Sequence, residues 1–321
     1  MAHIVVLATG GTIASTRDSS PGATATEAID SLLKEVDTGG HTVTSQDVLT
    51  TGSYLLTHHH LRIIAEAVKA TLQRRDVDGV VLTHGTDTME ETAYLLHLVH
   101  DSHKPVVITG AQRTPDSLGA DGEFNLRDAI QVAGSPQSAE LGVVICFAGE
   151  IHPAARTKKL HTIAPSPFGG VGTIGYVAED EVKIRMTPRR SPALPLPGVK
   201  FDDTRIDVVV SHPGADATLA RASVAASAHG VIILGTGAGN GNHALTEWVA
   251  EASAAGVVVG VSTRAFGGPV LPLYGNGGAA DLFDAGAVSL GDLPWSQARI
   301  LLAYLLSAGV DVSPEALADF I

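Results

Sequence analysis

The chain has 321 residues, a formal net charge of −13 and a hydrophobic content of 45%. This composition indicates a folded globular protein with a sizeable core, and the length favours two domains. The acidic balance argues against nucleic acid or an anionic membrane surface as the main partner, although a local site can still hold a small anionic substrate.

The sequence predicts neither a membrane span nor an export signal. The first predicted strand begins by His3, with no basic segment or small-residue cleavage site before it, so we expect no signal peptide. No apolar run approaches the ~20 residues that a membrane span needs. We therefore expect a cytoplasmic protein.

Cysteine and histidine usage gives no metal site. The single cysteine, Cys146, permits no intrachain disulfide, and its apolar neighbours are typical of a buried strand. Three consecutive histidines start a predicted helix at His58, but consecutive helical residues point in different directions and cannot share one metal ion. We expect neither a metal nor another cofactor.

Strands and helices alternate along the first half of the chain. The predicted strands are the apolar runs 3–8, 42–48, 79–82, 105–109 and 141–147. The predicted helices are 57–75, a segment that begins near Asp87 or Thr88, and 123–133. This alternation predicts an α/β fold with a doubly wound, mostly parallel sheet, in which right-handed crossovers bring the carboxyl ends of the strands to one edge.

A second, smaller α/β domain follows a linker. Segments 171–177 and 181–184 suggest a hairpin, and four prolines between Thr187 and Val199 interrupt regular structure. We place an N-terminal domain at 1–186, a linker at 187–205 and a C-terminal domain at 206–321. The C-terminal elements that we expect are strands at 207–210, 230–234 and 257–261, and helices at 218–228, 242–254 and 296–306.

The first predicted strand ends in a glycine-rich turn. Ile4 to Ala8 is followed by the sequence Thr9-Gly10-Gly11-Thr12-Ile13-Ala14. Two glycines allow a tight turn and a close approach of the backbone to a ligand. Thr12 is therefore expected to present its hydroxyl at the carboxyl end of the strand.

A second turn of this kind follows the strand at 79–82. It reads His84-Gly85-Thr86-Asp87-Thr88, and Glu90 and Glu91 then fall in the first turn of the next helix, where the helix dipole favours acids. Ligands bind at the carboxyl ends of strands in such sheets. Two threonines at strand ends, one with an adjacent aspartate, suggest acyl transfer by a hydroxyl nucleophile.

Together, these two turns resemble the two signatures of the bacterial-type L-asparaginase (asparaginase/glutaminase) family. The resemblance extends in order over nearly the whole chain. Its further segments are Gly52-Ser53, Ala120-Asp121-Gly122 with Asn125-Leu126, Gly239-Asn240-Gly241-Asn242 and Gln297-Ala298-Arg299.

The resemblance implies hydrolysis of L-asparagine to L-aspartate and ammonia, with L-glutamine as a possible side substrate. Thr12 would attack the side-chain amide and form an acyl-enzyme. Thr86, Asp87 and Lys159 would form a second catalytic group, in which Thr86 either activates water or attacks directly. A homodimer or homotetramer is implied, with each site near a subunit interface.

Further roles follow from the same resemblance. Ser53 would hold the α-carboxylate of the substrate and Asp87 its α-ammonium group. Tyr54 stands where a glutamine often follows the binding serine, which would alter the pocket. Lys159 lies nine residues before Phe168, the spacing expected of the family's lysine, and Lys158 is its rival. A lysine base needs a pKa lowered by burial or by positive charge.

The sequence also departs from the family pattern. Segment 15–28 contains no tyrosine, although many members carry one there that is thought to activate the first threonine. Tyr54 and Tyr274 are candidates to replace it. Asp281 is a candidate for the acid that a neighbouring subunit often supplies to the substrate amine.

Three alternatives remain open. The missing loop tyrosine leaves room for a non-catalytic amino-acid sensor of the same fold. A subunit of a tRNA-dependent amidotransferase would need an RNA-docking surface, which this acidic chain does not indicate. The segment 235–240 nearly matches a dinucleotide-binding fingerprint but has Asn240 at the last glycine. Asparagine and glutamine differ by one methylene, which a pocket distinguishes by only ~1–3 kcal/mol.

Overall fold

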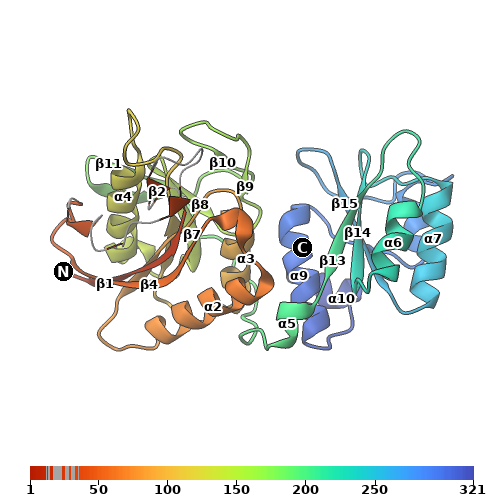
Figure 1. Cartoon of the computed structure of the whole chain (residues 1–321), viewed down its shortest axis with the longest axis horizontal. Helices are drawn as coiled ribbons and strands as arrows, with labels where there is room; N and C mark the ends of the chain where they lie inside the picture. The colour runs from red at the N-terminus through yellow and green to blue at the C-terminus, as the bar shows by residue number, and fades with distance from the viewer. Residues whose placement is uncertain (12, 14, 17–23, 26–28, 30–32, 35) are drawn as a thin grey trace. The chain divides into compact units, whose positions relative to one another are not determined.

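The computed structural model describes every residue of the chain except 12, 14, 17–23, 26–28, 30–32 and 35. It divides into two compact units, Met1–Leu196 and Pro197–Ile321 (Figure 1). The division falls inside the proline-rich segment 187–205. Thr12 and most of segment 15–28 lie outside the described residues, apart from a short antiparallel pair, β2 (Ser15–Thr16) with β3 (Thr24–Ala25).

An eight-stranded sheet forms the centre of the N-terminal unit, in the order β12-β11-β8-β7-β6-β5-β1-β4. Its first five strands along the chain are parallel, and the other three extend it antiparallel. The parallel strands are β1 (His3–Gly10), β4 (Thr42–Thr51), β5 (Gly79–Thr83), β6 (Val106–Thr109) and β7 (Val143–Phe147). Their spatial order, β4-β1-β5-β6-β7, reverses direction between β1 and β5, which is where open α/β sheets bind ligands.

Three helices cover the two faces of this sheet, so the predicted doubly wound α/β class is confirmed. One face packs on α4 (Gly122–Gly134), and α2 (His58–Leu72) with α3 (Met89–Val99) covers the other (Figure 1). All five residues of β5 are buried because both of its faces are covered. Thr57 closes a capping box with His60 at the start of α2, which accounts for one of the three consecutive histidines.

The antiparallel extension consists of β8 (Glu150–Pro153), β11 (Gly175–Ala178) and β12 (Glu181–Ile184). A two-residue turn at Ala148 and Gly149, with φ of 51° and 76°, reverses the chain from β7 into β8. Positive φ at both central residues is the geometry that fits the twist of a tight hairpin. A second turn at Glu179 and Asp180, with φ of 49° and 66°, joins β11 to β12 as the hairpin expected from the sequence.

The C-terminal unit repeats the α/β plan on a smaller, fully parallel sheet in the order β13-β14-β15-β16. Trp248 and Leu245 of α7 pack with Val231 and Ile233 of β14 in its core. The elements are α5 (Lys200–Asp203), β13 (Ile206–Val210), α6 (Thr218–Ala225), β14 (Gly230–Gly235), α7 (His243–Ala254), β15 (Val258–Thr263), α8 (Ala279–Asp284), β16 (Val288–Ser289), α9 (Trp295–Ser307) and α10 (Pro314–Leu317). Within the described part of the chain, no helix combines the length and apolarity needed to cross a bilayer.

Three strand ends meet at the carboxyl edge of the larger sheet with almost no space between their backbones. A Cβ atom on Gly11, after β1, would lie 2.5 Å from the backbone nitrogen of Gly85, after β5. A Cβ on Gly85 would in turn lie 2.5 Å from Ser53 Oγ, after β4. Gly11 also has a φ of +89°, which side chains rarely adopt. These glycines therefore allow the three turns to converge.

We predict that Gly11→Ala destabilises the N-terminal unit more than Gly40→Ala. Gly40 also has a positive φ, +79°, but a Cβ there would meet nothing within 4 Å. The control should therefore lose about 1 kcal/mol from backbone strain, and Gly11→Ala about 1–3 kcal/mol more from overpacking. Urea unfolding followed by circular dichroism measures both. Equal losses would show that the contact with Gly85 does not constrain the turn.

Candidate active site

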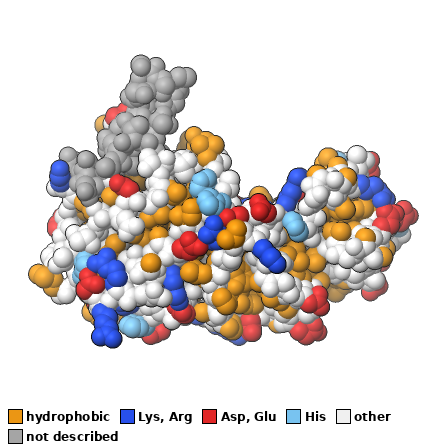
Figure 2. Space-filling model, turned by 60° about the horizontal axis from the view of Figure 1, so that its bottom comes forward, with side chains coloured by type: hydrophobic (Ala, Val, Ile, Leu, Met, Phe, Trp, Pro, Cys, Tyr) orange, Lys and Arg blue, Asp and Glu red, His pale blue; other side chains and the backbone are white. Residues whose placement is uncertain are grey.

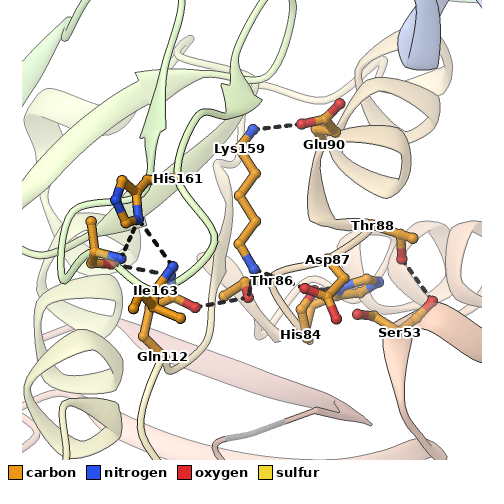
Figure 3. A network of polar contacts seen from close by, with 12 residues as sticks. Ser53, His84, Thr86, Asp87, Thr88, Glu90, Gln112, Lys159, His161 and Ile163 are labelled. Carbon is orange, nitrogen blue, oxygen red and sulfur yellow. Dashed lines mark hydrogen bonds and ion pairs between the residues drawn. The ribbon is translucent and has the colours of Figure 1, made fainter.

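The Thr86 hydroxyl is the centre of a polar network at the carboxyl end of β5 (Figure 3). Thr86 is 5% exposed, and its Oγ1 donates to Gln112 Oε1 at 3.1 Å. Lys159 Nζ donates to the same Oγ1 at 2.8 Å. A neutral hydroxyl thus lies between an ammonium group and an amide oxygen.

Lys159 is held at both ends. Its Nζ also donates to Asp87 Oδ1 at 2.8 Å, and its backbone nitrogen donates to Glu90 Oε2 at 2.5 Å. The Lys159 side chain is 14% exposed, whereas that of Asp87 is 57% exposed. Lys159 belongs to β9 (Lys158–Lys159), which pairs with β10 (Phe168–Gly169) so that Lys159 faces Phe168 across the ladder. The side chain therefore reaches Thr86 from a short hairpin that α3 anchors through Glu90.

The rival lysine, Lys158, is the preceding residue of the same strand. Successive side chains of a strand point to opposite faces, so only one of the two can reach Thr86. Burial lowers the pKa of Lys158, and the nearby Glu90 carboxylate opposes that shift. Of the two lysines, the structure brings Lys159 to the other predicted residues.

Ser53 joins the same edge from the end of β4. It lies in a short helical turn, η2 (Ser53–Leu55), and is 4% exposed. Its carbonyl oxygen accepts from Thr88 Oγ1 at 2.8 Å, which ties this turn to the start of α3 (Figure 3). Tyr54 differs: its ring packs beside Gly52, and the side chain is 70% exposed.

The predicted nucleophile, Thr12, lies outside the described residues. Its neighbours are described: Gly11 packs against Gly85, and Ile13 is 1% exposed. The chain therefore passes the Thr86 turn immediately before Thr12 and enters the core immediately after it.

His84 supports the Thr86 turn from the buried side of the site. It is completely buried, its Nδ1 lies 2.7 Å from the Gly85 carbonyl oxygen and its Nε2 lies 2.9 Å from Thr92 Oγ1. The carbonyl can only accept, so Nδ1 carries the proton and Nε2 accepts from the threonine. Burial lowers the pKa of His84 to about 4, although the hydrogen bond to Gly85 opposes the shift. His84 is thus a neutral support and not an acid at neutral pH.

Two residues of the network, Gln112 and Glu90, were not singled out from the sequence as site residues. Gln112 follows β6, so the strand-end rule that identified Thr86 also applies to it. Its backbone nitrogen donates to both carboxylate oxygens of Asp121, at 3.0 and 3.1 Å, which orders the start of the loop. Glu90 was expected only to complement the helix dipole.

The remaining candidates lie in the C-terminal unit. Tyr274 is 62% exposed, and the Asp281 carboxylate accepts from the backbone nitrogen of Gly277 at 2.6 Å. In the near-fingerprint segment, Asn240 Oδ1 accepts from the Ala279 nitrogen at 3.1 Å, which gives this asparagine a structural partner. Among the residues that the structure describes, no cluster of three His, Cys, Asp or Glu side chains could hold a metal ion.

Known proteins resemble this chain over nearly its whole length. A family model described as "Asparaginase, N-terminal" matches residues 3–190, and one described as "Glutaminase/Asparaginase C-terminal domain" matches residues 205–318. A probable L-asparaginase of Deinococcus radiodurans is 34% identical over 311 residues, which is 96% of this chain and 94% of that protein.

Two further similar proteins cover nearly the full length. An L-asparaginase of Bacillus licheniformis is 32% identical over 320 residues, 95% of each chain. The crystal structure of a probable cytoplasmic L-asparaginase from Campylobacter jejuni superposes with a TM-score of 0.86 at 29% identity, over 96% of this chain and 95% of that one. The similarity therefore includes both units.

The pKa of His84 predicts a loss of stability in acid. The unfolded chain binds a proton at His84 below about pH 6.5, whereas the folded chain binds it only below about pH 4. The contribution of neutral His84 to the free energy of unfolding is therefore fully present above about pH 6.5. As the pH falls, this contribution is lost, and the free energy of unfolding is lower by about 3 kcal/mol at pH 4.

We expect His84→Gln to reduce the difference in unfolding free energy between pH 7 and pH 4, because an amide keeps a donor and an acceptor but does not titrate. Urea unfolding at both pH values measures this difference. Wild-type protein unfolded at the same two pH values provides the reference difference. An unchanged difference in His84→Gln would contradict the assignment.

Proposed function

This chain belongs to the asparaginase family, and from that premise we propose that it hydrolyses L-asparagine to L-aspartate and ammonia through a threonine nucleophile. Two family models together account for almost the whole chain. The observation that carries the proposal is the hydrogen-bonded group of Lys159, Thr86 and Asp87 beside the turn that leads into Thr12.

The first step forms an acyl-enzyme. The Thr12 hydroxyl oxygen bonds to the side-chain amide carbon of asparagine, the carbon–nitrogen bond breaks, and the nitrogen leaves as ammonia with the hydroxyl proton. A threonine hydroxyl needs an activating partner to react in this way. Since segment 15–28 contains no tyrosine, we propose that the ion pair of Lys159 and Asp87 supplies the polar environment for this step.

Substrate positioning uses the neighbouring groups. Asp87 is exposed enough to meet the α-ammonium group, and Ser53, packed against Gly85, suits the α-carboxylate. Backbone N–H groups of the two glycine turns are candidates for stabilising the oxyanion, because such donors are fixed before the reaction begins. We propose that Tyr54, with a side chain that is 70% exposed, lies at the rim of the substrate site.

Glutamine is the natural side substrate, and the name of the matched C-terminal family model includes both activities. An extra methylene changes binding by only ~1–3 kcal/mol. Because the similar Campylobacter jejuni protein is a probable cytoplasmic L-asparaginase, we propose a cytoplasmic location for this chain. We also propose a homodimer or homotetramer, as the family resemblance implies.

The alternatives have less support. On the face seen in Figure 2, basic and acidic side chains are interspersed, which does not favour the RNA-docking surface of a tRNA-dependent amidotransferase subunit. An amino-acid sensor of the same fold would bind asparagine without releasing ammonia, so the experiment below distinguishes it.

Purified protein should release ammonia from L-asparagine, and more slowly from L-glutamine. Thr12→Ala should lose this activity because no nucleophile remains, and Thr86→Ala should lose most of it. A coupled ammonia assay gives the rates, and circular dichroism establishes that the variants are folded. Binding of asparagine by calorimetry without any ammonia release would identify a sensor.

The adjacent lysines provide a matched pair. Lys159→Met should lower kcat by about 10²–10⁴-fold, because it removes the group that contacts both Thr86 and Asp87. Lys158→Met removes the same charge from the same strand, and its kcat should stay close to that of wild type. The reverse ranking in the ammonia assay would assign the catalytic role to Lys158.

A further inference from the structure

The Thr86 hydroxyl has two partners of opposite character. A hydroxyl has one proton to donate and two lone pairs that accept. The Lys159 ammonium can only donate, and it lies 2.8 Å from Oγ1. Gln112 Oε1 can only accept, and it lies 3.1 Å from the same atom. The proton of Thr86 therefore points to Gln112 and one lone pair faces Lys159, while no other residue that the structure describes donates to the second lone pair.

The orientation of the Gln112 amide is fixed by a contact on its other side. Its Nε2 donates to the carbonyl oxygen of Ala164 at 3.1 Å. Reversing the amide would place its oxygen against that carbonyl, with no hydrogen between two acceptors. Ala164 thus keeps the Gln112 oxygen directed toward Thr86.

Ala164 is itself held by a turn that a histidine closes. His161 Nδ1 accepts from the backbone nitrogens of Ile163, at 3.1 Å, and Ala164, at 2.9 Å (Figure 3). An asparagine side chain closes turns in the same way, with its oxygen in the place of this nitrogen. The chain of contacts therefore runs from His161 through Ala164 and Gln112 to Thr86.

We propose that Gln112 is a positioning residue that holds the proton of Thr86, so that the free lone pair of Thr86 orients the water that hydrolyses the acyl-enzyme. This inference rests on the proposed function and assigns Thr86 to the second step. A nucleophilic Thr86 would instead direct its proton to a base at Lys159, and no acceptor at Gln112 would compete for it.

In the second step, hydrolysis of the acyl-enzyme, Thr86 keeps its proton. The water oxygen bonds to the ester carbon, and the bond between that carbon and Thr12 Oγ1 breaks. One water hydrogen stays hydrogen-bonded to Thr86, and the other is transferred to Thr12 as its hydroxyl re-forms. The product carboxyl group then releases its proton to solvent.

Gln112→Met tests this directly, because methionine resembles glutamine in shape but cannot accept the Thr86 proton. We expect kcat to fall about 10- to 100-fold, as for the loss of a hydrogen bond to a reacting group. The value of kcat/KM should change little, since it reports the steps up to ammonia release. Rapid quenching should show a burst of one ammonia per active site before the slow steady state.

Two variants at His161 provide a graded comparison. His161→Ala opens the turn that presents Ala164, so it should lower kcat in the same way but by less. His161→Asn should restore kcat, because its side-chain oxygen can accept from the same two backbone nitrogens. If Gln112→Met does not fold, as judged by its thermal unfolding, this pair carries the test.

The results of these experiments distinguish failure of the proposed function from failure of the positioning role of Gln112. No ammonia from wild type would overturn the proposed function itself. An active wild type with an unchanged kcat in Gln112→Met would overturn the positioning role. Equal losses in kcat and kcat/KM without a burst would overturn it as well, because Gln112 would then act before ammonia release.

Discussion

The close approach of three backbone turns is the constraint on which the proposed site depends. Gly11 and Gly85 leave no room for a side chain between the ends of β1 and β5, and Ser53 closes the group from β4. This edge is also where the strand order reverses, so three neighbouring strands deliver their first loop residues to one place. The reactive groups are thus positioned by the sheet itself, and His84 supports the turn from within the core as a neutral residue.

The direction of the hydrogen bonds at the Thr86 hydroxyl connects the fold to the proposed reaction. Thr86 accepts from Lys159 and donates to Gln112, so its proton is directed away from the lysine. Under the proposed mechanism, the two threonines then have different tasks: Thr12 forms the ester, and Thr86 orients the water that breaks it. The hairpin of β9 and β10 and the His161 turn both belong to the segment that supplies Lys159 and anchors Gln112, which makes that segment part of the site although most of it is irregular.

The sequence predicted those features that depend on local patterns. The buried run before Thr83 and the helical spacing from Met89 place Thr86 and Asp87 at a strand end without knowledge of the fold. The contact of Gln112 with Ala164 spans 52 residues, and nothing local to either residue signals it. Likewise, β8 was not predicted, because its reversal uses Ala148 at a φ of 51°, and alanine gives no turn signal of the kind that Asn-Gly gives. The choice of Lys159 over Lys158 rested on a spacing, whereas the structure gives it a geometric basis.

The central claim is that the threonines divide the reaction, and mapping the covalent intermediate tests it most directly. Enzyme mixed with L-asparagine would be quenched in acid within its first turnovers, digested, and analysed by tandem mass spectrometry for an aspartyl ester. Our account predicts the ester on Thr12, with Thr86 unmodified. An ester on Thr86 would contradict the assignment, and steady ammonia release with no ester on either threonine would contradict the acyl-enzyme route.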